Sequence, residues 1–451
     1  MKMHWNQLIS NLRLGQEGRH GGNVAEGRTE FKRDYDRLIF SAPFRRLQNK
    51  TQVFPLPGSV FVHNRLTHSL EVASVGMSLG NDVCQHLHAR HGDDLGPLAS
   101  QIGQIVATAC LAHDMGNPPF GHSGEKAIQT FFTEGKGGGL RQRVSPEVWS
   151  DLTHFEGNAN AFRLLTHQFR GRRPGGFVMT YTALAAIVKY PYSSTLAGEK
   201  GKFGFFASEA DTFRRIATTL GMPEEPCAAD GVTGLRFARH PLVYLVEAAD
   251  DICYEVMDLE DAHKLKILSF DEASRLLLGF FDAATRQRLL QRIADEGISD
   301  HNEQIQYLRA CAIGKLESEC VKVFVDNEET ILEGRFEGSL IDHVAPLQRE
   351  AYRECTRVSR SRIYASQPVL DVELSGYRIM ATLMDLMVQA IDHPQRYYSQ
   401  QLIGRVSDQY DIRNPDFEKR LLAVVDYISG MTDVYALDVY QKICGISLPI
   451  V

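Results

Sequence analysis

Apolar residues recur at three- and four-residue steps along most of this chain, and this periodicity constrains its fold more than any other feature. The clearest runs cover residues 68–90, 101–113, 241–259 and 374–387. Strict alternation of polar and apolar residues, which is typical of half-buried strands, is scarce. The sequence therefore predicts an all-α protein.

Glycine and proline mark where these helices end. A chain of 451 residues exceeds one ordinary compact core, so we expect two or three units or one large helical domain. The expected breaks are a turn at 54–58, a break at 117–121, a glycine-rich linker at 135–139, exposed loops at 170–176 and 192–204, and a loop or short hairpin at 221–234.

The net charge of −7 gives no overall attraction to nucleic acid or anionic lipid, so a phosphorylated ligand would need a local basic pocket. No stretch approaches the roughly 20 apolar residues of a transmembrane helix, and Met1 to Ser10 lacks the apolar region of a secretory signal. None of the 8 cysteines forms a Cys-x-x-Cys pair. We therefore expect reduced core thiols in a cytoplasmic protein that does not enter membranes.

Four residues suggest a metal site. His113 and Asp114 close an apolar helix just before the break at 117–121, and His68 begins another apolar run. Asp250 lies on an otherwise apolar helix, where an ionised carboxylate is costly unless it is paired or bound to metal. Imidazole and carboxylate together suit Mn²⁺, Fe²⁺, Co²⁺, Ni²⁺ or Zn²⁺, and oxygen-rich variants accept Mg²⁺.

Each of these residues alone has a structural explanation. A His-Asp dipeptide occurs by chance in a chain of this length, His68 alone would usually be a core residue, and Asp250 could pair with a buried arginine. Together, in this order, they favour a metal site. Because no second cluster of similar strength is evident, we expect one divalent ion per subunit.

Several longer motifs accompany these residues. They are RDYDR at 33–37, RRLQNKTQVFPL at 45–56, RLTHSLEV at 65–72, HDMGNPPFGH at 113–122 followed by Gly124 and Glu125, HFEGNA at 154–159, EAADDI at 247–252 and YISGMTD at 427–433. This set resembles the bacterial deoxyguanosine triphosphate triphosphohydrolases of the HD-domain superfamily. The resemblance runs from about residue 28 to about 438 and is weak at 135–150, 195–235 and 265–370.

The resemblance implies an HD-domain helical fold with an additional helical C-terminal region. Residues 1–60 would form an N-terminal segment that contributes to the active site, and residues 61–270 the catalytic core. Residues 271–451 would contribute to the nucleotide site and to oligomerisation. It further implies a homo-oligomer, often a hexamer, that hydrolyses dGTP to deoxyguanosine and triphosphate with Mg²⁺ or Mn²⁺.

His122 and Glu125 lie three residues apart at the start of a helix and so share a face. By the resemblance, His122 is the catalytic histidine near the α-phosphate and Glu125 orients it. A carboxylate partner fixes the imidazole tautomer and raises its basicity, although acid, base and nucleophile roles remain open. Alternatively, Glu125 only caps the helix and His122 bonds a backbone group.

The resemblance also implies the substrate contacts. Arg65, Lys189 and Asn158 would bind phosphates, with His154 nearby, although any single cation of this kind could be a solvated charge. Tyr254 would pack on the deoxyribose and exclude a 2′-hydroxyl, unless it is simply a core residue. Asp258 and Gln52 would hydrogen-bond the 3′-hydroxyl. Glu373 would accept hydrogen bonds from guanine, and Arg405 would stack on the base.

Two other classes of function fit parts of this pattern. One is a different HD enzyme: a broad dNTP triphosphohydrolase activated by an effector nucleotide, or a nucleotidase or phosphodiesterase. The other is a non-catalytic sensor of nucleotides or single-stranded DNA, against which the complete set of His68, His113, Asp114 and Asp250 with His122 and Glu125 argues. No basic, aromatic-studded stripe predicts a single-stranded DNA site.

Overall fold

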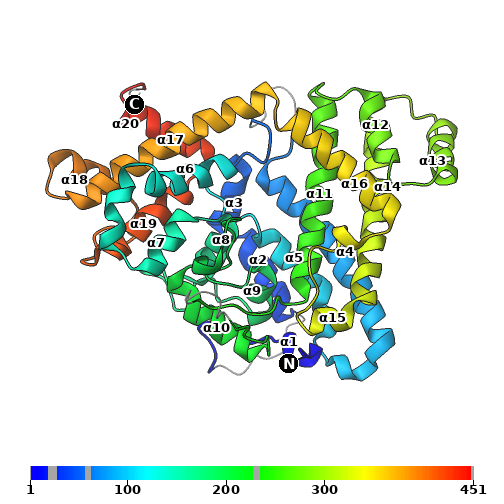
Figure 1. Cartoon of the computed structure of the whole chain (residues 1–451), viewed down its shortest axis with the longest axis horizontal. Coiled ribbons are helices and arrows are strands. Elements are labelled where there is room, and N and C mark those ends of the chain that lie inside the picture. Colours follow the sequence, from blue (N-terminus) through cyan, green and yellow to red (C-terminus); the bar gives the residue numbers. More distant parts are fainter. Residues whose placement is uncertain (1, 19–27, 56–61, 227–233, 448–451) are drawn as a thin grey trace.

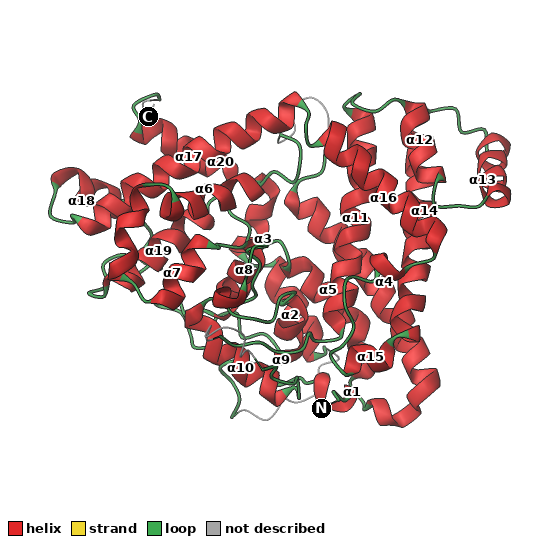
Figure 2. Ribbon diagram, viewed as in Figure 1, coloured by secondary structure: helices red, strands yellow, loops and turns green. Residues whose placement is uncertain are grey.

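The computed structural model describes residues 2–18, 28–55, 62–226 and 234–447. Within these ranges the regular elements are helices, and Figure 2 draws helices and loops throughout. The described extended pairs are isolated bridges, such as Tyr192 with Arg236. The prediction of an all-α fold is confirmed. Part of the turn at 54–58, part of the loop at 221–234 and Cys227 lie outside the described residues.

The α-helices are α1 (Trp5–Leu8), α2 (Glu30–Ile39), α3 (Ala42–Arg46), α4 (Arg65–His91), α5 (Ile102–Ala112), α6 (Gly121–Thr133), α7 (Pro146–Thr153), α8 (Gly157–Thr166), α9 (Tyr181–Ile187), α10 (Ala210–Thr219), α11 (Leu242–Lys264), α12 (Phe270–Leu278), α13 (Ala283–Asp295), α14 (His301–Asp326), α15 (Glu328–Leu332), α16 (Pro346–Val358), α17 (Gln367–Asp392), α18 (Tyr397–Gly404), α19 (Phe417–Ser429) and α20 (Asp433–Ile443). Short 3₁₀ turns include η2 (Leu47–Asn49), η5 (Lys136–Arg143), η6 (Ser194–Leu196) and η7 (Ala207–Glu209), and η9 (Ser359–Ile363) is a π turn.

Helix α5 lies at the centre of the larger hydrophobic core. Its residues are all buried except Gln104, as expected for a helix that is apolar on every side. Helix α4 crosses it closely, because a Cβ atom at Gly80 would lie 2.7 Å from the Cα atom of Gly103. This crossing sets the first turn of α4, with His68, beside the last turn of α5, which leads to His113. Helices α11 and α14 pack against α4 (Figure 1).

A second core joins α6 and α7 to the C-terminal helices α17, α19 and α20. Figure 1 shows α17 running across one end of the molecule, with α6 beneath it and α18, α19 and α20 beside it. Both cores contain residues from more than one of the three segments expected from the sequence. The division at residues 60 and 270 therefore stays a prediction.

Two expectations about loops were wrong. Residues 135–139 are not a linker, because most of them belong to η5, which packs on α6. A Cβ atom at Gly137 would lie 2.6 Å from the Phe131 ring, so the glycines permit close packing. The segment 192–204 is not an exposed loop either, since Phe203 and Ser194 are buried. Residues 170–174 are exposed, as expected.

The seven described cysteines are free. Five are buried, as expected for core thiols, whereas Cys311 is partly exposed and Cys444 is exposed after the end of α20. The expectation was therefore wrong for Cys444, which follows the last amphipathic helix instead of belonging to its apolar face. Among the described helices, none is both long and apolar enough to cross a membrane.

A buried ion cluster joins helix α8 to the C-terminal helix α19. Arg163 on α8 makes a bidentate pair with Asp426 on α19, with its Nε and Nη2 atoms 2.7 and 2.8 Å from the two carboxylate oxygens. Its Nη1 atom donates to Glu209 Oε1 at 2.8 Å. All three side chains are buried. Burial raises the pKa of Glu209, but Arg163 reverses this effect and the pKa is lowered overall.

We expect Arg163→Ala to destabilise the protein by about 3–5 kcal/mol, because it leaves two buried carboxylates without a counter-charge. Arg357→Ala is the matched control, since Arg357 forms an exposed pair with Glu354 and should cost at most about 0.5 kcal/mol. Thermal and urea unfolding of both variants measure the difference. Equal stability of the two variants would show that the buried cluster does not join the two cores.

Candidate metal centre

The four residues predicted to hold a metal converge in the structure. His68 Nε2 lies 3.1 Å from Asp250 Oδ1, and His113 Nε2 lies 3.4 Å from the same oxygen. His113 Nε2 is also 3.7 Å from Asp114 Oδ1. One ligand atom from each of His68, His113 and Asp114 lies within 4.8 Å of the others. These side chains come from α4, the end of α5 and α11.

Local sequence places the two histidines. Asn64 caps α4 by accepting hydrogen bonds from the backbone N–H groups of Leu66 and Thr67, so the helix begins at Arg65 and His68 lies near its first turn. His113 follows the last residue of α5, and its Nδ1 atom donates to Cys110 O at 2.6 Å. This bond leaves Nε2 of His113 directed toward the two carboxylates.

The donor set fits a divalent cation. Nε2 of His113 is buried and makes no hydrogen bond within the described part of the chain, although a buried polar atom normally has a partner. Two imidazoles and two carboxylates supply nitrogen and oxygen ligands of the kind that first-row divalent metals bind. A cation at this position would satisfy Nε2 of His113 and lower the cost of burying two carboxylates.

The charges of the cluster depend on one another. Burial lowers the pKa of His113, but Asp114 and Asp250 outweigh it and raise that pKa to about 9. Burial raises the pKa of Asp250, yet His113 and His68 hold it well below its usual value. Asp250 keeps 32% of its side chain exposed, so the cluster opens to solvent on that side.

Arg65 contacts Asp114 through Oδ2, whereas His113 lies nearest to the other carboxylate oxygen, Oδ1. Its Nη1 atom donates to Asp114 Oδ2 at 2.7 Å, and both side chains are buried. Asn117 donates to the other carboxylate oxygen of Asp114. Arg65 Nε is buried and has no partner in the segments that the structure describes. Arg65 was predicted to bind phosphate, and in the structure its guanidinium is held by the predicted metal ligand Asp114.

His122 and Glu125 form the pair that the sequence predicted. His122 Nδ1 donates to Glu125 Oε2 at 2.8 Å, while Glu125 Oε1 accepts from the backbone N–H of Gly157 at 2.8 Å. The hydrogen bond to Glu125 raises the pKa of His122. The His122 side chain is 82% exposed, whereas Glu125 is buried. Glu125 thus holds one nitrogen of His122 and leaves the ring accessible to a ligand. Across the described residues, His122 bonds the Glu125 side chain and no backbone group, so the alternative interpretation is not supported.

The structure adds one cation that the sequence analysis missed. Lys202 lies 2.7 Å from Glu156 Oε1, and its charge acts on His122 and Glu125. Glu156 also accepts from the side chain of Asn158 at 2.8 Å, so Lys202 and Asn158 share one carboxylate. Lys202 belongs to the segment expected to be an exposed loop, and nothing in its local pattern indicated this position.

Tyr254 and Asp258 follow Asp250 at four-residue steps and so share one face of α11. The Tyr254 ring packs edge-on to His68, with centroids 6.4 Å apart. Asp258 is buried and accepts a hydrogen bond from Tyr364 at 2.7 Å. Burial raises the pKa of Asp258 well above its usual value. Tyr364 was missed because it lies in 265–370, where the sequence offered no motif.

Four predicted substrate contacts remain, and each has a different environment in the structure. Gln52 Oε1 is buried and has no hydrogen-bond partner among the described residues, so it can accept a hydrogen bond from a ligand. Lys189 lies 3.1 Å from Glu247, and this ion pair keeps the pKa of Lys189 raised although burial lowers it. Glu373 is exposed on α17, and its backbone oxygen accepts from Ser123, next to His122. Arg405 is exposed and lines a separate cavity with Tyr427 and Tyr435.

Comparison with known proteins identifies two families along the chain. Residues 65–145 match the HD domain, and residues 343–442 match a phosphohydrolase-associated domain. A deoxyguanosinetriphosphate triphosphohydrolase-like protein of Pseudomonas aeruginosa (strain PAO1) is 36% identical over 99% of this chain and 100% of its own length. One from Synechocystis sp. (strain PCC 6803) is 38% identical over the same shares. The deoxyguanosinetriphosphate triphosphohydrolase of Yersinia enterocolitica is 29% identical over 92% of this chain and 93% of its own length.

The associated domain reaches the metal-centre loops through Asp433. One carboxylate oxygen accepts from the backbone N–H of Thr51 at 2.7 Å, and the other accepts from that of Phe120 at 2.9 Å. Thr51 precedes Gln52, and Phe120 has a φ of 62° just before α6 and His122. Lys50 donates to the backbone oxygens of Asn117 and Ser429. A single buried carboxylate thus fixes two loops that belong to distant parts of the chain.

We expect Asp433→Asn to loosen both loops, because an amide offers one acceptor oxygen where the carboxylate offers two. A loss of about 1.4 kcal/mol would make the amide protons of Thr51 and Phe120 exchange with solvent about tenfold faster. Hydrogen exchange measured by NMR or mass spectrometry tests this. Asp438→Asn is the control, since Asp438 on α20 forms a partly exposed pair with Lys442 away from both loops. Unchanged exchange in Asp433→Asn would refute the clamp.

Proposed function

Because this chain belongs to the HD-domain family of deoxyguanosinetriphosphate triphosphohydrolase-like proteins, we propose that it hydrolyses dGTP to deoxyguanosine and inorganic triphosphate. The observation that carries the proposal is the convergence of His68, His113, Asp114 and Asp250 on α4, α5 and α11. The unpaired, buried Nε2 atom of His113 supports a metal at that cluster.

His68, His113, Asp114 and Asp250 would hold one divalent ion, Mg²⁺ or Mn²⁺, and Fe²⁺, Co²⁺, Ni²⁺ or Zn²⁺ also suit these ligands. Such an ion lowers the pKa of bound water and polarises a phosphoryl oxygen. Asp114 and Asp250 are held ionised by Arg65, His113 and His68, and two ionised carboxylates beside two imidazoles are a suitable ligand set for such an ion. Metal dependence is therefore part of the proposal.

His122 would act on the reacting phosphate. Its Nδ1 atom is held by Glu125, so its Nε2 atom is the one free to meet the substrate. Because Glu125 is itself fixed by the backbone N–H of Gly157, the imidazole is restrained in one orientation before the substrate arrives. The raised pKa of His122 favours the protonated ring, which stabilises negative charge on the triphosphate.

The triphosphate itself needs several cationic partners. Lys189, Lys202 and Arg65 would supply charge, and Asn158 would add an amide donor. Lys202 supports this role best, because its charge already acts on both His122 and Glu125. Each of these cations is paired with a carboxylate, which keeps it charged and oriented until phosphate oxygens compete for it.

The sugar and base contacts follow from α11 and α17. Tyr254 beside His68 would lie against C2′ of the deoxyribose, and Asp258 and Gln52 would bond the 3′-hydroxyl. Glu373 would accept from guanine, given that its backbone lies against Ser123 next to His122. Arg405 would reach the base only if its exposed side chain came from a neighbouring subunit or moved, and a homo-oligomer such as a hexamer is part of this proposal.

The decisive experiment incubates the protein with each of the four dNTPs, singly and mixed, and with GTP, in Mg²⁺ or Mn²⁺. We expect deoxyguanosine and tripolyphosphate from dGTP, and loss of turnover in EDTA or in Asp250→Asn. His122→Ala should abolish turnover and leave dGTP binding within about twofold. Release of phosphate or pyrophosphate would contradict the proposal, and turnover only in mixtures would indicate an effector-activated dNTP enzyme.

We further expect Tyr254→Ala to weaken discrimination against ribose. Removing the ring opens space at C2′, so the ratio of kcat/KM for dGTP over GTP should fall at least about tenfold, or ~1.4 kcal/mol. Tyr254→Phe keeps the ring and is the matched control, with the ratio close to that of the unchanged protein. If Tyr254→Ala lowered kcat/KM equally for both nucleotides, the ring would be a packing residue and not a filter.

A further inference from the structure

The segment from η6 to η7, residues 194–207, carries Lys202, and we call it the lysine loop. Its tip is exposed and turns through Gly198 and Gly201, whose φ values are 57° and 64°. An exposed turn does not by itself fix the side chain that follows it. The charge of Lys202 nevertheless acts on His122, so the rest of the lysine loop must hold Lys202 in place.

A buried carboxyl group on a neighbouring helix holds both ends of the lysine loop. Asp151 on α7 accepts from Ser194 Oγ at 2.6 Å through Oδ1 and from the backbone N–H of Ala207 at 2.8 Å through Oδ2. Ser194 begins η6 and Ala207 begins η7, so these two hydrogen bonds, which we call the Asp151 clasp, fix the entry and the exit of the loop relative to α7. Helix α7 in turn packs on α6, which carries His122 and Glu125.

The part of the lysine loop that follows Lys202 is packed into both hydrophobic cores. Phe203 and Phe206 belong to the core around α6 and α17, and Phe205 belongs to the larger core around α5. The Phe206 ring packs edge-on to Phe203, with centroids 5.5 Å apart. Because close packing of this kind links Lys202 to Ala207, a contact that holds Ala207 also holds the lysine.

The Asp151 clasp does not require a charge. Asp151 is 1% exposed, and among the described residues the nearby Arg163 pairs with Glu209 and not with Asp151. Burial raises the pKa of Asp151 to about 7, although the hydrogen bonds from Ser194 and Ala207 oppose this effect, so the ionised and neutral forms both occur near neutral pH. A neutral carboxyl group accepts from Ala207 with one oxygen and donates to Ser194 Oγ with the other, because a hydroxyl group both donates and accepts.

We propose that Asp151 is a positioning residue for the triphosphate site: by closing the lysine loop, it places Lys202 beside His122 and Glu125. The ammonium group of Lys202 is held separately by Glu156 at 2.7 Å, so the Asp151 clasp acts on the backbone and Glu156 on the tip of the side chain. This inference rests on the proposed function for the role of Lys202 toward phosphate, whereas the placement of Lys202 is a property of the chain without substrate.

The pKa of His122 reports the position of Lys202. The hydrogen bond to Glu125 raises this pKa, whereas burial and the charges of Lys202 and Arg65 lower it. Diethyl pyrocarbonate reacts with the neutral imidazole, so the pH dependence of its reaction with His122, followed by peptide mass spectrometry on the full-length chain without nucleotide, gives the titration midpoint. We expect Lys202→Gln to raise this midpoint and Asp151→Ala to raise it as well. The double variant should shift it no further than Lys202→Gln alone.

Asp151→Asn tests whether the two hydrogen bonds are the cause. The amide accepts from Ala207 and donates to Ser194 Oγ, so the midpoint should return to that of the unchanged chain. Ser194→Ala keeps Asp151 and removes one of the two bonds, so it should give a smaller shift than Asp151→Ala. Circular dichroism verifies folding, and Ser194→Ala decides the question if Asp151→Ala does not fold.

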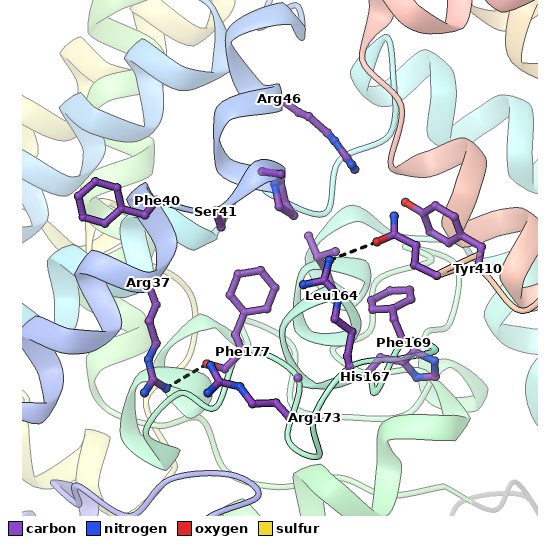
Figure 3. Close-up of a pocket in the computed structure, with 15 residues that line it drawn as sticks. Arg37, Phe40, Ser41, Arg46, Leu164, His167, Phe169, Arg173, Phe177 and Tyr410 are labelled. Carbon is purple, nitrogen blue, oxygen red and sulfur yellow. Dashed lines mark hydrogen bonds between the residues drawn. The ribbon is translucent and has the colours of Figure 1, made fainter. Parts of the chain in front are cut away.

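Arg173→Gln is the matched control for the loss of one positive charge. Figure 3 shows Arg173 beside Arg37 in a cavity of about 370 Å³ that shares no residue with the lysine loop or with Asp151. Arg173 is exposed, so this variant should fold normally and leave the midpoint of His122 unchanged.

Steady-state kinetics with dGTP add a second measurement. Asp151→Ala and Lys202→Gln should each raise KM about tenfold, because both deprive a phosphate of one charge-assisted hydrogen bond, and the double variant should raise it no more than Lys202→Gln. Absence of dGTP hydrolysis by the unchanged chain would refute the proposed function without affecting the His122 titration. A midpoint unmoved by Lys202→Gln or by Asp151→Ala, additive shifts in the double variant, or equal shifts in Asp151→Asn and Asp151→Ala would overturn the positioning role.

Discussion

Two ionised carboxylates inside a packing of apolar helices are the constraint on which the rest of the structure depends. Asp114 and Asp250 are each costly in that environment, and the chain offsets the cost with His68, His113 and Arg65. This arrangement requires the start of α4 and the end of α5 to meet, which in turn requires the close helix crossing at Gly80 and Gly103. The packing of α4 on α5 and the position of the charged cluster therefore depend on each other.

The loops around the cluster depend on helices far away in sequence. Lys50 is buried, and burial lowers its pKa to about 7 even though Asp433 opposes that effect. Its hydrogen bonds to the backbone oxygens of Asn117 and Ser429, and those from Thr51 and Phe120 to Asp433, connect three segments in one buried polar network. Such a network is favourable only when all its members are in place, so the C-terminal helices complete the site as well as covering it.

The long helices and the metal ligands could be predicted from the sequence, because their signals lie within single segments of the chain. The long helices follow from apolar periodicity, and the convergence of the four predicted ligands followed from polar residues that interrupt apolar helices. Lys202 and Tyr364 could not be found this way, because each lies near the site only through tertiary packing. The glycines of η5 were misinterpreted for the same reason: their small size serves a contact with Phe131 and not chain flexibility. Apolar periodicity shows which face of a segment must be buried, but it does not show which other segment packs against that face.

The charge balance around Asp114 explains why a cation and a polyanion would favour each other here. One carboxylate oxygen accepts from Asn117 and the other from Arg65, so each oxygen already has one partner and keeps a lone pair for a metal ion. A divalent cation that shares Asp114 places positive charge beside the buried Arg65, and the repulsion between them is strong at low dielectric. Phosphate oxygens can accept from the Arg65 Nε atom, which has no partner, and at the same time neutralise the added charge. Metal binding and triphosphate binding would then be coupled through one carboxylate, since each removes the electrostatic cost that the other incurs.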